Sequence, residues 1–150
     1  MVVVGYDPYV SGEVAADSGI RSVTLDELIE QSDVVTLHLP LSEKTHHLIG
    51  ADALGRMKSG AMLINCARGG LIDEAALFEA LESGHLGGAA LDVFESEPPA
   101  DLRLVQHPRV VATPHLGAST HEAQVRVGTE IAGKIRDYLE KGIILDAVEF

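Results

Sequence analysis

Three residues of kinds that bind anions or move protons stand in loop-like segments of this 150-residue chain: Arg68, Glu97 and His115. Imidazole exchanges protons near neutral pH, and a neighbouring carboxylate orients the ring and stabilises its protonated form. An arginine grips a carboxylate through two parallel hydrogen bonds. Such a set suits the oxidation of an alcohol, where a hydroxyl proton is removed as hydride leaves the carbon. The separation of Glu97 and His115 along the chain permits their pairing without requiring it.

Each candidate also has a plainer interpretation. Asp7 begins "DPYVSG", where Asp-Pro favours a turn. The alternative, given equal weight, is that its carboxylate binds the ribose hydroxyls of a dinucleotide and selects NAD over NADP. Arg68 is either a solvated loop residue or a ligand-binding one, and the two glycines after it favour close approach to a ligand. Asp92 is either a turn residue or part of a site, and Glu97, like its neighbour Glu95, is in a loop where most glutamates face water.

Two alternating patterns indicate the elements that position these residues. Short runs rich in Val, Ile, Leu and Ala predict parallel strands buried on both faces; they cover residues 2–6, 34–39, 61–65, 87–93 and 109–113. Helical patterns lie between and after them, at residues 24–31, 73–84 and 119–142. This alternation predicts an α/β fold, a Rossmann-like, doubly wound parallel sheet with helices on both faces.

End signals mark the first two helices. Thr24 and Glu27 have the spacing of a capping box, in which side chain and backbone bond reciprocally at the helix start. Asp73 is a candidate N-cap of the second helix, and Gly84 is its stop signal.

The third helix repeats these signals over a longer segment. Ser119 and Glu122 again have capping-box spacing, and Gly142 closes the helix. Apolar residues recur every four positions and predict one buried stripe: Ala123, Val127, Ile131, Ile135 and Leu139.

Polar residues recur where the predicted strands end. Because parallel strands point the same way, these ends meet at the carboxyl edge of the sheet, where open α/β sheets bind ligands. The residues at or just beyond the ends are Asp7, His38, Cys66, Ala67, Arg68, Asp92 and His115. His115 is therefore expected to share this edge with an arginine and two aspartates.

Composition excludes several classes of protein. The net charge of −12 opposes binding to nucleic acid over any broad surface. The apolar runs are too short to span a membrane, and the single cysteine, Cys66, fits a reducing cytoplasmic compartment. The "THH" at residues 45–47 lacks a cysteine or carboxylate at ligand spacing, so no metal site is predicted. The length predicts one domain with its own core.

Five segments carry a resemblance to a known family: "GYDPYVS", "TLHLPLSEKTHHLIG", "INCARGGLIDEAAL", "GAALDVFESEPP" and "TPHLGASTHEAQ". Over essentially its whole length the chain resembles the D-isomer-specific 2-hydroxyacid dehydrogenases. The resemblance implies an NAD cofactor, a small 2-hydroxy acid substrate and a homo-oligomeric enzyme. "HLGAST" followed by "EAQ" favours the branch that oxidises 3-phosphoglycerate to 3-phosphohydroxypyruvate at the start of serine synthesis.

The resemblance also assigns roles to individual positions. Arg68 matches the arginine that holds the carboxylate and carbonyl of the substrate, and Glu97 and His115 match the acid–base pair, with His115 as proton donor during reduction. Asp7 matches the ribose-binding acid. The full set of implied cofactor contacts is Asp7, His38, Leu39, Pro40, Cys66, Ala67, Arg68, Asp92, His115, Leu116 and Gly117. Alternatives are a dehydrogenase for another 2-hydroxy acid, such as glyoxylate or hydroxypyruvate, and a non-catalytic NAD(H)-binding or assembly module.

The start of the chain departs from the family pattern. A dinucleotide fold opens with a strand and a G-x-G-x-x-G turn, whereas "MVVVGYDP" resembles the second strand of that fold. We therefore expect residues 1–150 to form an N-terminally incomplete NAD-binding domain without the substrate domain. We also expect a gap between the strand that ends at Asp7 and the strand with His38. Unpaired edges there predict a poorly stable isolated chain that re-pairs its strands or associates.

Overall fold

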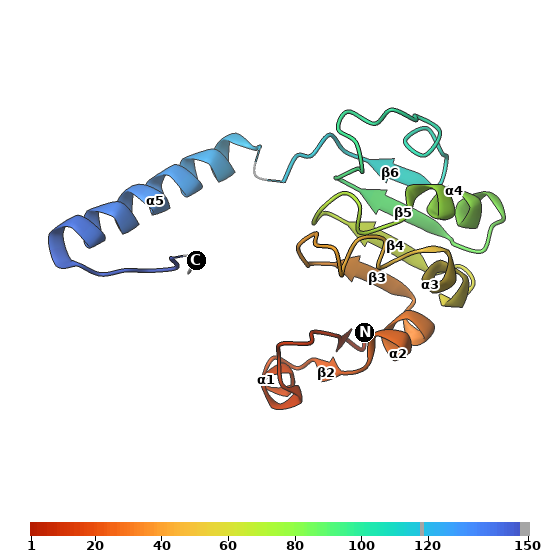
Figure 1. The fold of residues 1–150 in the computed structure, drawn as a ribbon, viewed down its shortest axis with the longest axis horizontal. Helices are drawn as coiled ribbons and strands as arrows, with labels where there is room; N and C mark the ends of the chain where they lie inside the picture. The colour runs from red at the N-terminus through yellow and green to blue at the C-terminus, as the bar shows by residue number, and fades with distance from the viewer. Residues whose placement is uncertain (118, 148–150) are drawn as a thin grey trace. The chain divides into compact units, whose positions relative to one another are not determined.

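A computed structural model describes residues 1–117 and 119–147 (Figure 1). In chain order the elements are β1 (Val4–Gly5), α1 (Gly12–Asp17), β2 (Arg21–Ser22), α2 (Leu25–Gln31), β3 (Val34–Leu37), α3 (Ala51–Arg56), β4 (Met62–Asn65), α4 (Glu74–Glu82), β5 (Gly88–Leu91), β6 (Val110–Ala112) and α5 (His121–Lys141). The chain forms two compact units, Met1–Pro114 and His115–Phe150, where its length predicted one domain. No helix of the described residues is both long and apolar enough to cross a membrane.

All paired strands are parallel, which confirms the predicted α/β class. The larger sheet has the order β3-β4-β5-β6, and β1 pairs with β2 in a separate two-stranded sheet. The expected gap is present, because within the described residues β1 pairs only with β2 and β3 only with β4. The chain does not close this gap by re-pairing its strands.

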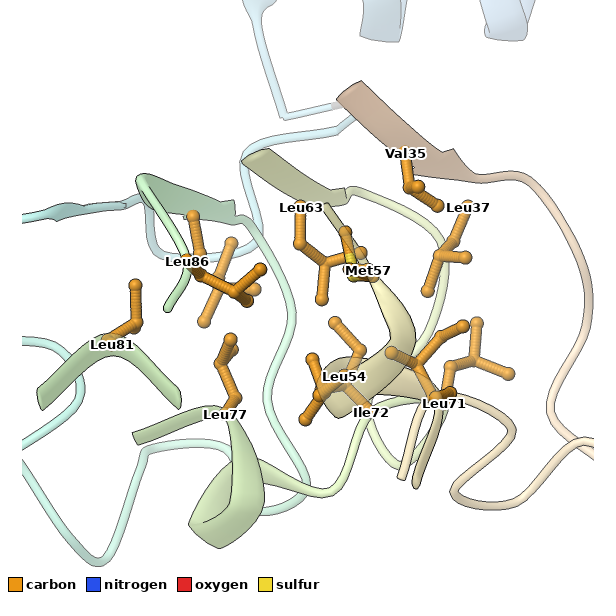
Figure 2. Close-up of a cluster of buried hydrophobic side chains, with 14 of the residues drawn as sticks. Val35, Leu37, Leu54, Met57, Leu63, Leu71, Ile72, Leu77, Leu81 and Leu86 are labelled. Atoms are coloured by element: carbon orange, nitrogen blue, oxygen red, sulfur yellow. The ribbon is translucent and has the colours of Figure 1, made fainter. Parts of the chain in front are cut away.

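The core lies on one face of the larger sheet, as Figure 2 shows. Side chains of β3 and β4, such as Val35 and Leu63, contact a layer that includes Leu54 of α3 and Leu77 of α4. Helix α2 adds Ile29 to the same cluster. Helices α2, α3 and α4 therefore cover one face of the sheet.

The prediction that the strands are buried on both faces is wrong for β1, which has no buried residue, and for three of the four strands of the larger sheet. On the face opposite the core, Val34, Met62 and Val111 are 52%, 53% and 67% exposed. On the core face, Val35 and Leu63 are 3% and 0% exposed, and Val110 and Ala112 of β6 are partly buried. The continuous apolar runs concealed this alternation because both faces carry apolar side chains.

Three elements were not predicted: α1, β2 and α3. Among residues 1–28, all of them described, no residue is buried, so α1 and β2 have no apolar periodicity to reveal them. Helix α3 has six residues, and its N-cap Gly50 makes no side-chain hydrogen bond. Helix α1 does have an N-cap, Ser11, but short elements without an apolar stripe are difficult to detect from a sequence.

The N-terminal signals predicted for three helices are correct for two of them. Thr24 and Glu27 form the complete capping box of α2, and the Asp73 side chain accepts a hydrogen bond from the Ala76 N–H at the start of α4. The predicted capping box of Ser119 with Glu122 is wrong. Thr120 is the N-cap of α5, because its side chain accepts from the N–H of Ala123.

Helix α5 has the predicted pattern without the predicted burial. It ends at Gly142, which has the left-handed φ of 66° that glycine adopts readily. None of its residues, all described, is buried. Ile131, Ile135 and Leu139 of the apolar stripe are 50%, 54% and 75% exposed.

The two faces of β4 lead to a prediction about stability. Leu63→Ala should lower the free energy of unfolding by about 2–5 kcal/mol, because it opens a cavity in the core. Met62→Ala, one residue earlier on the open face, should change it by about 0.5 kcal/mol or less. Urea unfolding of both variants followed by circular dichroism measures the difference. Equal effects would mean that the face bearing Met62 is covered in solution.

Candidate active site

The four strands of the larger sheet end at aligned positions at their carboxyl ends. Leu37 aligns with Asn65, Asn65 with Leu91, and Leu91 with Ala112. The residues that follow these positions are His38, Cys66, Asp92 and Thr113. The predicted gathering of strand-end residues is thus confirmed for His38, Cys66 and Asp92, which come from three neighbouring strands.

The turn that presents Arg68 is shaped by Asn65. This buried asparagine donates from Nδ2 to the Arg68 carbonyl oxygen at 2.9 Å, and its Oδ1 accepts from the N–H of Ala67 at 3.0 Å. Arg68 is exposed, and its Nη1 donates to the Ala67 carbonyl oxygen at 2.6 Å. Asn65 was not singled out from the sequence, although an amide at the end of the apolar run "AMLIN" is the signal that could have done so.

Gly69 allows a close approach, as predicted, and the group that approaches it in the structure is a backbone carbonyl. A Cβ at this position would lie 1.8 Å from the carbonyl oxygen of Phe94, so the missing side chain lets two backbone segments touch. The prediction assigned the pair of glycines to the approach of a ligand. Gly70 has a φ of +78°, which favours glycine on conformational grounds alone.

Asp92 is buried, at 6% exposure, rather than a solvated turn residue. Its Oδ1 accepts a hydrogen bond from the Thr113 hydroxyl at 2.5 Å, and its N–H donates to the Asn65 carbonyl oxygen at 3.0 Å. Thr113 was not a predicted site residue. The two contacts fix the Asp92 carboxyl group at the sheet edge, between β4 and β6.

The predicted acid–base residues lie in different units. Glu97 belongs to the first unit, where its Oε1 accepts from the Phe94 N–H at 3.2 Å. His115 begins the second unit; it is exposed, and its φ of 52° is left-handed. The pairing of their side chains stays a prediction. Leu116 and Gly117, the next predicted contacts, are exposed, and the Leu116 carbonyl oxygen accepts from the Ser119 N–H at 2.6 Å.

The segment after β3 holds three predicted cofactor contacts. His38 is exposed, with Nε2 3.0 Å from the Thr36 hydroxyl, and Leu39 is half-buried. Pro40 is exposed, and its carbonyl oxygen accepts from the Thr45 hydroxyl at 2.8 Å. The segment therefore leaves the sheet edge in a fixed turn with His38 accessible.

Asp7 follows β1, and its interpretation as a turn residue is confirmed, while its binding to a ribose stays a prediction. Its Oδ1 accepts from the Tyr9 N–H at 2.8 Å, which is the predicted turn. It also lines an open hollow of about 690 Å³. The hollow is lined by Tyr6, Asp7, Ser22, Val23, Thr24, Leu25, Asp26 and Glu27. Three of these are carboxylates, and hydrogen bonds from the Thr24 backbone and hydroxyl lower the pKa of Glu27.

Most other histidines have structural partners. His85 Nε2 lies 3.1 Å from the Leu54 carbonyl oxygen, and His107 Nε2 lies 3.1 Å from Glu82 Oε1. His107 lies in the loop before β6 and is buried, at 7% exposure. Among residues 1–117 and 119–147, no group of three or more His, Cys, Asp or Glu residues is arranged to hold a metal ion.

Comparison with known proteins gives a consistent result. Residues 1–117 match the family described as D-isomer specific 2-hydroxyacid dehydrogenase, NAD binding domain. D-3-phosphoglycerate dehydrogenase of Bacillus subtilis (strain 168) is 48% identical over 148 residues, which are 99% of this chain. The chain spans 28% of the length of that relative.

Solved structures with similar folds include two dehydrogenases. A glyoxylate reductase from Paecilomyes thermophila superposes with a TM-score of 0.85 at 39% identity, over 97% of this chain and 44% of that one. D-Lactate dehydrogenase with NAD+ from Lactobacillus jensenii gives a TM-score of 0.85 at 32% identity, over 99% of this chain and 48% of that one.

Proposed function

Because the chain belongs to the D-isomer-specific 2-hydroxyacid dehydrogenases, through their NAD-binding domain, we propose that it serves an enzyme that interconverts 3-phospho-D-glycerate and 3-phosphohydroxypyruvate. The observation that supports this proposal is the aligned set of strand ends, after which His38, Cys66 and Asp92 follow on neighbouring strands. The choice of substrate rests on the 48% identity to a D-3-phosphoglycerate dehydrogenase. We further propose that the enzyme works in serine synthesis as a homo-oligomer.

The residues fit an NAD cofactor. Ribose hydroxyls are donors for the Asp7 carboxylate, which lines the hollow beside β1. Asp26 is paired with Arg56, but Asp7 and Glu27 also line the hollow, and we expect their negative charges to repel a 2′-phosphate. At the edge of the larger sheet, we assign Cys66, Ala67 and Asp92 to the nicotinamide half of the cofactor.

The proposed chemistry divides among three side chains. When bound, NAD+ would accept the hydride during oxidation, and NADH would donate it during reduction. The Arg68 guanidinium binds the substrate carboxylate with paired hydrogen bonds, and its exposure leaves it accessible. His115 takes the hydroxyl proton during oxidation and returns it to the carbonyl oxygen during reduction, while Glu97 stabilises the imidazolium.

A test of the proposed function uses the product of the complete reading frame that encodes this chain. With 3-phosphoglycerate and NAD, formation of NADH should be followed at 340 nm. Faster turnover of glyoxylate or hydroxypyruvate would instead support one of these acids as the substrate. The similarity to a glyoxylate reductase is the observation that favours this alternative. NADH binding without turnover of any of these acids would support the non-catalytic module.

The choice between NAD and NADP gives a second prediction. Asp7→Asn keeps an oxygen that accepts from the Tyr9 N–H, but it removes the charge that faces a 2′-phosphate. The preference for NADH over NADPH should fall about 10-fold, or about 1.4 kcal/mol. Fluorescence titration with each nucleotide measures it. Asp17→Asn, at the end of α1 and outside the residues that line the hollow, is the matched control, and an equal change in both variants would contradict the role of Asp7.

A further inference from the structure

His47 links two segments of the proposed site. It lies in the loop between β3 and α3, where its φ of 50° is left-handed. Its backbone N–H donates to the Gly70 carbonyl oxygen at 2.8 Å, and two residues later the Ile49 N–H donates to the Leu71 carbonyl oxygen at 3.1 Å. The His47 backbone is therefore fixed to the segment that directly follows Arg68.

The imidazole of His47 reaches the other segment. Its Nε2 lies 2.8 Å from Glu95 Oε1. A carboxylate can only accept hydrogen bonds, so Nε2 is the donor. The other ring nitrogen, Nδ1, lies 3.9 Å from Asp73 Oδ2, and the ring of His46 stacks on that of His47 with 3.9 Å between centroids.

Glu95 is held from a second side by the start of α4. The Glu95 N–H donates to Glu74 Oε1 at 2.6 Å, and the Glu74 N–H donates to Glu95 Oε1 at 3.4 Å. Burial raises the pKa of Glu74. The hydrogen bond from the Glu95 N–H lowers this pKa, and the negative charge of the Glu95 carboxylate raises it further. The Glu95 side chain is thus bound on both sides while its backbone continues into the loop that bears Glu97.

Glu97 depends on the same short loop. The N–H of Phe94, directly before Glu95, donates to Glu97 Oε1 at 3.2 Å. The Phe94 carbonyl group packs against Gly69, the residue that directly follows Arg68. A displacement of Glu95 would therefore move the Phe94 N–H and the Glu97 carboxylate together.

We propose that His47 is a positioning residue, which braces the Glu97-bearing loop against the Arg68-bearing turn through its backbone N–H and its imidazole. This inference rests on the proposed function for the roles of Arg68 and Glu97. His47 and Glu95 are 35% and 38% exposed, so solvent screens their attraction and the contact adds little to global stability. Its effect is on geometry, and small misplacements of catalytic groups have large effects on rate.

The test compares variants that keep the backbone conformation. His47→Gly suits the left-handed φ and retains the N–H that bonds to Gly70, and Glu95→Ala removes the other partner. Each should lower kcat on the order of 10-fold with the KM for NAD unchanged. The double variant should lose no more than either single one, because both break the same contact. Glu95→Gln keeps an acceptor and should restore most of the turnover, and Lys44→Ala, at an exposed position of the same loop, should keep normal turnover.

An exchange measurement separates this inference from the proposed function. In the 150-residue chain, His47→Gly should speed hydrogen exchange at the Phe94 amide by about 10-fold or more, with no change at Leu63 in β4. Unchanged exchange at Phe94, unchanged kcat, or additive losses in the double variant would overturn the brace. If the complete protein is inactive with every 2-hydroxy acid, the proposed function fails, and exchange at Phe94 alone decides whether the brace exists.

Discussion

His115→Ala should lower turnover roughly 100- to 10,000-fold, the range that loss of a general acid–base group commonly produces. The expected reason is that an alanine side chain cannot take the hydroxyl proton as hydride leaves. The KM for NAD and the affinity for NADH should change little, because the adenosine half is assigned to the hollow beside Asp7. Steady-state kinetics of the complete protein and a separate NADH titration measure the two effects.

The matched control is His121→Ala, an exposed histidine at the first position of α5. It should leave turnover within about twofold of the original protein, since a surface substitution away from the site has small effects. If His115→Ala turns over normally, the acid–base assignment is wrong. If both substitutions abolish activity together with NADH binding, the loss reflects damage to the second unit rather than proton transfer.

Gly69→Ala should lower the free energy of unfolding by about 3 kcal/mol or more. Its Cβ would lie 1.8 Å from the Phe94 carbonyl oxygen, 2.4 Å from the carbonyl carbon and 3.0 Å from the Glu95 nitrogen. All three are backbone atoms, which cannot rotate away as a side chain does. The two loops must separate, so activity should fall together with stability.

Gly55→Ala is the control for this substitution. Gly55 lies within α3, and among the described residues nothing lies within 4 Å of the place that an added Cβ would take. Alanine in a helix interior is favoured over glycine by about 0.5–1 kcal/mol, so this variant should be slightly more stable. Thermal unfolding of the two variants gives the comparison, and a neutral Gly69→Ala would show that the loops do not touch in solution.

The sequence was most informative where residues repeat a local rule. The strand runs, the capping box of Thr24 with Glu27, and the polar residues at the strand ends were all predicted. The capping box of Ser119 with Glu122 failed because Thr120, one residue later, has an equally suitable hydroxyl. Two hydroxyl residues in a row leave the start of a helix undetermined by spacing alone.

Contacts between distant residues were beyond the reach of sequence patterns. The bond of His47 to Glu95 spans 48 positions, and nothing near either residue indicates its partner. Gly69 was correctly expected to allow a close approach, but whether a ligand or the Phe94 carbonyl approaches it depends on tertiary structure. The exposure of Met62 was unpredictable for a related reason, because an apolar side chain indicates a preference for burial and not what covers it.

The absence of buried residues among positions 1–28 gives the hollow beside Asp7 an unusual character. Segments with few buried contacts open at lower free-energy cost than a packed core, so we expect ordered and open members of an ensemble here. A nucleotide that binds there would select the ordered members of this ensemble, and its apparent affinity would be lower than the contacts alone provide. Binding of the cofactor would then raise the population of the ordered conformation of its own binding site.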